Sequence, residues 1–280
     1  MSLTKGINHM STKSITTQAG NGDGQISYVA VRNSLLNALT VSSGAVDAIS
    51  FLALGKVFTA FMTGNFAFLG MVFASTTGST VYGVVAPRAI SVLAAMAGFA
   101  VGVFLATKIV RQHAPKDEQA TGIVWPERTT FALGFSLLAH LCFVFIWLAT
   151  SARPGDNVIP VLLAVWGLAM GIQSGAVRKL DVGGTFTTAA TATFIFLASN
   201  VRYLPLMSDE RRRLRGILIS LVIGATAGGL LLIHAPIYAP VLPLIITAGV
   251  VAIAASTFRY RNEMQDSRVK VQSAAGARAA

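Results

Sequence analysis

The sequence predicts an all-α integral membrane protein with about six transmembrane spans, arranged as two inverted three-span repeats. Three observations support this prediction. Of the 280 residues, 54% are hydrophobic and only 12% are charged, whereas a soluble domain carries about 25% charged residues. Apolar segments of spanning length recur along the chain, and the two longest resemble each other. The lysines and arginines gather in the segments that would lie on one side of a membrane.

The chain begins and ends with polar segments. Residues 1–28 are rich in Ser, Thr and Gly and lack the apolar core of about 7–15 residues that an ordinary cleaved signal peptide needs. We expect a disordered cytoplasmic tail over 1–28 and a second one over 260–280. A single membrane domain would then span 29–259, with repeat halves over about 33–150 and 159–258.

The apolar segments fall into two classes. A transmembrane helix needs roughly 20 mostly apolar residues, and four segments provide one simple helix each, at about 89–107, 129–150, 216–234 and 241–258. Two others, about 33–75 and 159–200, are too long for one helix and have polar residues and glycines in the middle. We expect each long element to cross once in net terms, with a tilted, broken or re-entrant piece that is buried in protein or lines a cavity.

The basic residues favour six spans and orient them. With six spans, most of the 22 lysines and arginines fall on the side of the two tails and of loops 108–128 and 200–215. The opposite side receives only Arg88 and Arg153, so the positive-inside rule places both termini in the cytoplasm. Eight spans would move loop 108–128 and its basic residues outside, which weakens the asymmetry.

The two long elements resemble each other. At a shift of 128 residues, FTAFMTGNFAFL (58–69) lies over FTTAATATFIFL (186–197) with six of twelve positions identical. At a shift of 131, SGAVD (43–47) lies over SGAVR (174–178). Each half would cross the membrane an odd number of times, so the halves would be inverted. Many secondary transporters are built this way and bind their substrate near the midplane, beside broken helices.

The stretch SGAVDAISFLALGKVFTAFMTGNFAFLG (43–70) resembles the signature of the YoaK family of bacterial membrane proteins. The matching positions are Gly44, Asp47, Phe58, Met62, Thr63, Gly64 and Asn65. In the second half, the family's Gly-x-Gln and its Thr-rich box correspond to Gly171, Gln173, Thr187, Thr188, Thr191 and Thr193. Ala192 stands where the family often has a glycine, which puts a glycine-dependent bend there in doubt. The resemblance implies a multi-pass protein of the bacterial inner membrane and implies no biochemical activity.

Polar residues inside the long elements are the candidate binding residues for a solute or an ion. Asp47 is the most informative, because a carboxylate at the bilayer centre costs about 2.5–3.5 kcal/mol on insertion scales and usually faces a cavity or a partner. Its repeat counterpart is Arg178, so the two could pair across the repeat axis, or each could face the polar box of its own half. A structural ion pair or a position near a helix end is the alternative to a functional role. The full set is Asp47, Thr59, Thr63, Gly64, Asn65, Gln173, Arg178, Thr187, Thr188 and Thr191.

The Thr63-Gly64-Asn65 triplet predicts a helix break. A break exposes N–H groups at the start of the next helix, where an anion or a carbonyl oxygen can bind. The alternative is that the glycines and threonines only allow close helix packing. Lys56 could neutralise a ligand, but its side chain is more easily accommodated by extending to the membrane interface. His140 is a weaker candidate for a proton relay, with hydrogen bonding to a neighbouring helix as the alternative.

We therefore expect a small-solute transporter or permease-like protein with its site between the two broken elements. The alternatives are an integral membrane enzyme, which is less favoured, and a structural or assembly protein without a small-molecule site. The sequence contains no metal-ligand spacing, phosphate-binding loop or catalytic serine motif, so we expect no cofactor and no metal. The expected partners are the lipid bilayer and an unidentified small solute, without nucleic acid. The solute, the coupling ion and the oligomeric state are left open.

Overall fold

The computed structural model describes residues 16–75, 87–111, 124–178 and 208–258, together with positions 180, 194, 195 and 198. All regular structure in these ranges is helical, so the all-α prediction is confirmed there. Six of the described helices are long and apolar enough to cross a membrane. This number agrees with the six spans that the charge distribution favoured.

The simple spans lie close to their predicted positions. They are α3 (Ala89–Arg111), α4 (Glu127–Ala149) and α7 (Ser208–His234), followed by a last span over Pro236–Phe258 that opens with the short 3-10 helix η1 (Pro236–Tyr238). The helix α7 begins at Ser208, before the apolar segment predicted over 216–234. The polar residues at its start extend the helix, because each added residue contributes one more backbone hydrogen bond.

The first long element breaks into two helices, as predicted, but the predicted position is wrong: Thr63-Gly64-Asn65 lies in the first turn of α2, and the break precedes it. The helix α1 (Thr16–Ala53) contains the first span, Tyr28–Ala53, and α2 (Met62–Ser75) is a short apolar helix. Since α1 starts at Thr16, it includes residues that we expected to belong to the disordered tail over 1–28. The second long element contributes α5 (Ile159–Arg178). Thr187, Thr188 and Thr191 of its remaining part lie outside the described residues.

Two helix pairs form the framework of the bundle: α1 packs along α7, and α3 packs along α5. Glycines bring the backbones of each pair into contact. A Cβ atom on Gly44 of α1 would overlap the carbonyl oxygen of Leu221 in α7, and one on Gly171 of α5 would overlap the carbonyl oxygen of Phe99 in α3. Small residues at such positions let membrane helices approach closely, which increases their van der Waals contact.

Both pairs are parallel, because their contacts advance in the same direction along the two helices. Gly98 and Gly102 of α3 meet Ala164 and Leu168 of α5, while Gly224 and Gly228 of α7 meet Val41 and Ala45 of α1. Parallel pairing fits six alternating spans, since α1 and α7 are then the first and fifth spans, and α3 and α5 the second and fourth.

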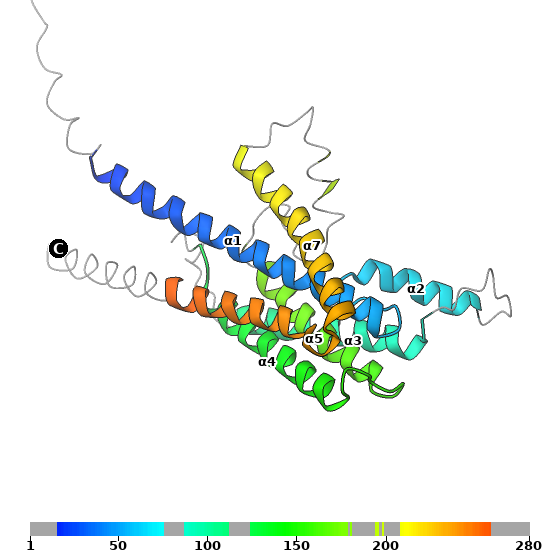
Figure 1. Ribbon diagram of the computed structural model, residues 1–280. Coiled ribbons are helices and arrows are strands. Elements are labelled where there is room, and N and C mark those ends of the chain that lie inside the picture. The colour runs from blue at the N-terminus through cyan, green and yellow to red at the C-terminus, as the bar shows by residue number, and fades with distance from the viewer. Residues whose placement is uncertain are drawn as a thin grey trace, which may run out of the picture.

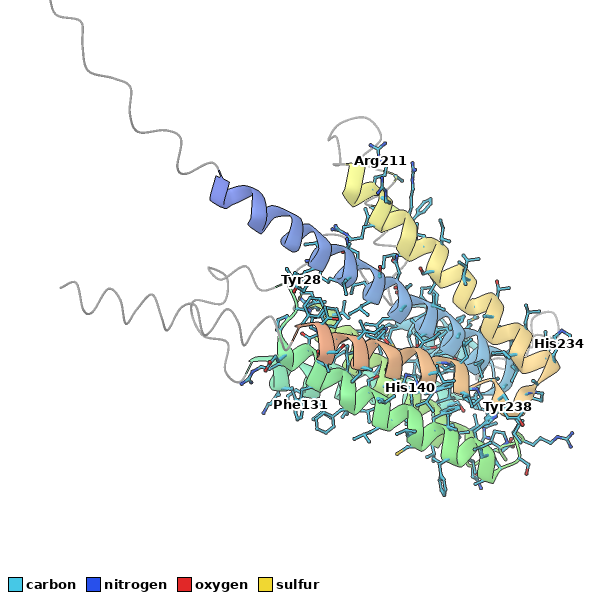
Figure 2. The ribbon with its side chains drawn as sticks, turned by 60° about the vertical axis from the view of Figure 1, so that its left-hand side comes forward. Tyr28, Phe131, His140, Arg211, His234 and Tyr238 are labelled. Atoms are coloured by element: carbon cyan, nitrogen blue, oxygen red, sulfur yellow. The ribbon has the colours of Figure 1, made fainter. Side chains whose placement is uncertain are left out.

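The described chain enters and leaves the bundle at the same end. The first turns of α1 and the end of the last span lie at the same end of the bundle, where Tyr28 packs against Phe258, whereas α2 lies at the opposite end (Figure 1). Tyr28, Phe131 and Arg211 mark the first end, and His234 and Tyr238 mark the second (Figure 2). We call these the basic end, which carries residues such as Arg128, Arg178 and Arg211–Arg215, and the far end, where α1 breaks.

Candidate functional site

The helix α1 ends where two successive residues adopt left-handed backbone conformations. Gly55 has φ 83° and Lys56 has φ 62°, and the second value is uncommon for a residue other than glycine. The amide of Lys56 donates to the carbonyl oxygen of Phe51 at 3.1 Å, which closes the helix. Residues 54–61, which we call the break segment, are then non-helical until α2 begins, and Lys56 is exposed.

Asp47 holds the break segment from α1. Its Oδ1 accepts hydrogen bonds from the backbone amides of Thr59, at 2.9 Å, and Ala60, at 2.8 Å. Both residues are buried in the far end of the bundle, where unpaired amides would be costly. An ionised acceptor forms stronger hydrogen bonds than a neutral one. The carboxylate therefore satisfies backbone groups that the helix break has released.

Asn65 holds the same segment from α2. This buried side chain accepts from the amide of Phe58 through Oδ1 at 3.1 Å, and it donates to the carbonyl oxygen of Phe58 through Nδ2 at 2.6 Å. Its amide group thus replaces the backbone partners that Phe58 would have in a helix. Together, Asp47 and Asn65 bind the backbone of three consecutive residues, Phe58, Thr59 and Ala60.

The other residues of the first box have different surroundings. Thr59 is fully buried, and its hydroxyl group has no hydrogen-bond partner among the described residues. Gly64 leaves room for aromatic rings, since a Cβ atom there would lie 2.7 Å from the ring of Phe61. Thr63 is exposed. The structure therefore brings Asp47, Thr59 and Asn65 together and leaves Thr63 outside this group.

Gln173 and Arg178 lie away from the break segment. Gln173 Nε2 donates to the carbonyl oxygen of Leu39 at 3.2 Å. Leu39 precedes Asp47 by about 12 Å along the axis of α1. Arg178 is exposed at the end of α5, and its neighbour Val177 packs in the apolar cluster of the basic end. The interpretation that Asp47 pairs with Arg178 is therefore wrong. The two helices run in opposite directions, so equivalent positions near their C-terminal ends lie at opposite ends of the bundle.

The middle of the bundle contains buried polar side chains that sequence reasoning largely missed. They lie between an apolar cluster at the basic end and another at the far end. Ser42 of α1 shares a hydrogen bond with Thr247 of the last span at 3.3 Å, and Ser136 of α4 donates to the carbonyl oxygen of Ala169 in α5 at 2.9 Å. We call this set the polar layer: Ser42, Ser43, Ser136, His140, Gln173 and Thr247.

His140 and Ser43 have unpaired polar atoms in this layer. Both side chains are fully buried, and among the described residues neither ring nitrogen of His140 nor the hydroxyl group of Ser43 has a hydrogen-bond partner. His140 lies midway along α4 (Figure 2), with its ring 6.4 Å from that of Trp166 in an edge arrangement. The expected hydrogen bond from His140 to a neighbouring helix is thus not observed in this part of the chain. Buried polar groups without protein partners are common positions for water or a ligand.

Isolated serines, threonines and a histidine gave only a weak signal in the sequence, because single polar residues in membrane spans often serve as helix contacts. His140 was noticed through its mid-span position, whereas Ser42, Ser43, Ser136 and Thr247 could only be grouped once the packing was known. Within the described ranges, no cluster of three or more His, Cys, Asp or Glu side chains could hold a metal ion.

Comparison with known proteins gives two matches. A family model described as "Protein of unknown function (DUF1275)" matches residues 35–254, a range that includes the break segment and the polar layer. The UPF0700 transmembrane protein YoaK of Bacillus subtilis (strain 168) is 35% identical over 172 residues, which are 61% of this chain and 68% of that protein. No solved structure matches the chain.

Proposed function

The chain belongs to the DUF1275 family, whose function is unknown, and is a multi-pass transmembrane protein; from this premise we propose that it transports a small solute. The supporting observation is the break between α1 and α2, where Asp47 and Asn65 hold three consecutive non-helical residues. Such backbone is tolerated at membrane depth where it is buried in protein or lines a cavity. Transporters commonly place their binding sites beside broken helices.

In this proposal the solute binds at the break segment. The buried hydroxyl group of Thr59 offers one donor and two acceptor positions and has no partner among the described residues. Asp47 supplies the negative charge. If a proton or a bound cation neutralises that charge, the hydrogen bonds that Asp47 accepts from the amides of Thr59 and Ala60 weaken, because they lose their ionic component. Neutralisation of Asp47 would thereby loosen the break segment. Binding of the ion at Asp47 would in this way be coupled to binding of the solute at that segment.

The polar layer offers the next set of contacts along the bundle. Between the two apolar clusters, His140 and Ser43 have polar atoms without protein partners in the described chain. A polar solute that leaves the break segment could exchange hydrogen bonds with these groups. The layer thus supports a path toward the basic end.

The helix packing supports two inverted halves. In such a repeat α1 and α5 would be equivalent, and so would α3 and α7. The observed pairs, α1 with α7 and α5 with α3, then have the same form: the first span of each half packs in parallel against the second span of the other half. Motion of one half against the other is the usual basis of alternating access in transporters built from inverted repeats.

Transport can be tested with purified protein in liposomes. The liposomes would be given a defined mixture of isotope-labelled amino acids, carboxylates, sugars and nucleosides under an imposed proton gradient. We expect at least one class to accumulate above the level of empty liposomes. Asp47→Asn should reduce its rate at least tenfold.

The matched control is Asp156→Asn, because Asp156 is an exposed carboxylate at the far end that pairs with Arg88 at 3.5 Å. This control should transport at the wild-type rate. Accumulation of no solute class by wild-type protein, or equal rates for wild type and Asp47→Asn, contradicts the proposal.

A further inference from the structure

A groove with a volume of about 950 Å³ opens at the basic end of the bundle. It lies between the first half of α4 and the end of the last span, with Ile109 of α3 beside it. The volume is at the upper end of the range for small-molecule sites, about 300–1,000 Å³. The groove is far from the break segment and is independent of the proposed transport function.

The walls of the groove are mostly apolar. Phe131 and Leu138 of α4 line it while 62% and 55% exposed, and Phe258 lines it from the last span. Gly134 lies between the two α4 side chains, and a Cβ atom there would meet nothing within 4 Å. The missing side chain leaves the groove open at its middle. An apolar ligand would cover side chains that no other described residue covers.

The groove is charged at one end only. Glu127 and Arg128 line it at the start of α4, about one turn before Phe131, which lies at the basic end (Figure 2). From Arg128 to Leu138 the helix rises about 15 Å, which matches one leaflet of a hydrocarbon core about 30 Å thick. The polarity of the groove therefore changes along its length as that of a phospholipid does.

Arg128 is held in place at this charged end. Its Nη1 donates to the carbonyl oxygen of Ile109 at 3.2 Å, and a guanidinium group has further N–H donors for a second partner. The wall beside it is rigid, because Trp125 stacks on Phe258 with ring centroids 5.6 Å apart and donates to the hydroxyl group of Thr130 at 2.8 Å. A fixed arginine beside an apolar channel matches a phosphate group attached to an acyl chain.

We propose that this groove binds an anionic glycerophospholipid. One acyl chain lies along Phe131, Gly134 and Leu138, and the phosphate group contacts Arg128. An anionic lipid is favoured over a zwitterionic one, because Lys108 near the end of α3, Arg178 at the end of α5 and the Arg211–Arg215 segment at the start of α7 are at the same end. Basic sites between membrane helices are known to bind anionic headgroups in this way.

The acyl chain can be tested by filling the groove. Gly134→Leu places a side chain where the structure has open space, and the matched control Gly70→Leu does the same on α2, away from the groove. The full chain in detergent would be titrated with phosphatidylglycerol while its thermal unfolding is followed. Saturating lipid should raise the Tm of wild type and of the control by about 5 °C. Gly134→Leu should lose this shift.

The headgroup can be tested with a pair of charge variants. Arg128→Gln removes the cation in the groove, whereas Lys108→Gln removes an exposed cation that lies over the ring of Phe104, 4.9 Å from its centroid. Wild type and Lys108→Gln should be stabilised more by phosphatidylglycerol than by phosphatidylcholine of the same chain length. Arg128→Gln should respond equally to both lipids, and inorganic phosphate alone should leave the wild-type Tm unchanged.

Three results would overturn the proposal. They are an undiminished shift in Gly134→Leu, an equal loss of lipid preference in Lys108→Gln and Arg128→Gln, and a full shift with inorganic phosphate. The first would mean that lipid does not enter the groove. The second would mean that the preference arises from the net charge of the basic end, and the third that no acyl chain is recognised.

Discussion

Asp47 and Asn65 have the same task at the scale of single residues: each side chain bonds backbone groups of the break segment. Asp47 accepts from two amides, and Asn65 bonds both the amide and the carbonyl oxygen of Phe58. A functional role for Asp47 must therefore be separated from this structural one.

Asp47→Ala should lower the free energy of unfolding by about 1–3 kcal/mol, because it leaves the buried amides of Thr59 and Ala60 without an acceptor. Asp47→Asn keeps an oxygen acceptor and should cost about 1 kcal/mol or less. Denaturant unfolding in micelles measures both values, with Asp156→Ala as an exposed control. If Asp47→Ala were as stable as this control, the side chain would not hold the break segment. Lost transport with retained stability in Asp47→Asn would separate coupling from folding.

Asn65→Asp is a nearly isosteric change with a large expected effect. It removes the donor that binds the carbonyl oxygen of Phe58 at 2.6 Å and places a carboxylate oxygen against that carbonyl oxygen. We expect a loss of about 2–3 kcal/mol in unfolding free energy at neutral pH. The control Asn157→Asp changes an exposed residue in the loop between α4 and α5 and should be neutral. Equal stabilities of the two variants in the same unfolding assay would contradict the assigned amide orientation.

At the scale of elements, glycines determine which helices pair. The contacts between α1 and α7 and between α3 and α5 place a helix backbone directly over a glycine, so any side chain there forces the helices apart. Other glycines of the bundle lack such a contact, and Gly249 in the last span is one of them. This difference predicts opposite effects for the same substitution.

Gly171→Ala should destabilise the protein by about 2–4 kcal/mol, because its Cβ atom would overlap the carbonyl oxygen of Phe99. Gly249→Ala should be neutral or stabilising by up to about 1 kcal/mol, since alanine favours the helix and its Cβ atom meets nothing within 4 Å. Thermal unfolding of the two purified variants provides the comparison. A smaller loss in Gly171→Ala than in Gly249→Ala would show that the α3–α5 contact is not as close as described.

At the scale of the whole molecule, the two ends of the bundle differ in charge. The basic end carries the arginines at the start of α7, whereas the far end carries Lys56, Arg88 and Arg153, with Arg88 paired to Asp156. Six spans whose first begins and whose last ends at the basic end, together with the arginines there, predict that this end faces the cytoplasm.

This orientation can be measured by cysteine labelling. The only cysteine, Cys142, is exposed on α4 and would first be replaced by alanine. In that background, Asn157→Cys at the far end should react with a membrane-impermeant maleimide in intact cells. Arg212→Cys at the basic end should react only after the membrane is permeabilised. The reverse labelling pattern would show that the far end, and not the basic end, faces the cytoplasm. Equal labelling of both positions in intact cells would contradict the placement of the two positions on opposite sides of the membrane.

The number of spans, their positions and the break after α1 follow from the sequence because each depends on local properties. Spanning length requires a run of apolar residues. An element of about 42 residues with polar residues in its middle is too long for one helix, which predicts a break but not its position: the break lies at 54–61, before the Gly64-Asn65 pair. The same local reasoning placed Asp47, Thr59 and Asn65 among the candidate residues, together with others that the structure leaves apart from them. It also predicted the family to which the chain belongs, through the motif over 43–70.

Only the tertiary structure decided what these residues touch. The partners of Asp47 are amides of the break segment rather than Arg178, because antiparallel helices carry equivalent positions to opposite ends of the bundle. The polar layer and the groove are likewise built from separate helices, and their residues are scattered between positions 42 and 258. Periodicity and turn chemistry act within about one helix length, whereas the packing of side chains joins residues that no sequence window contains together.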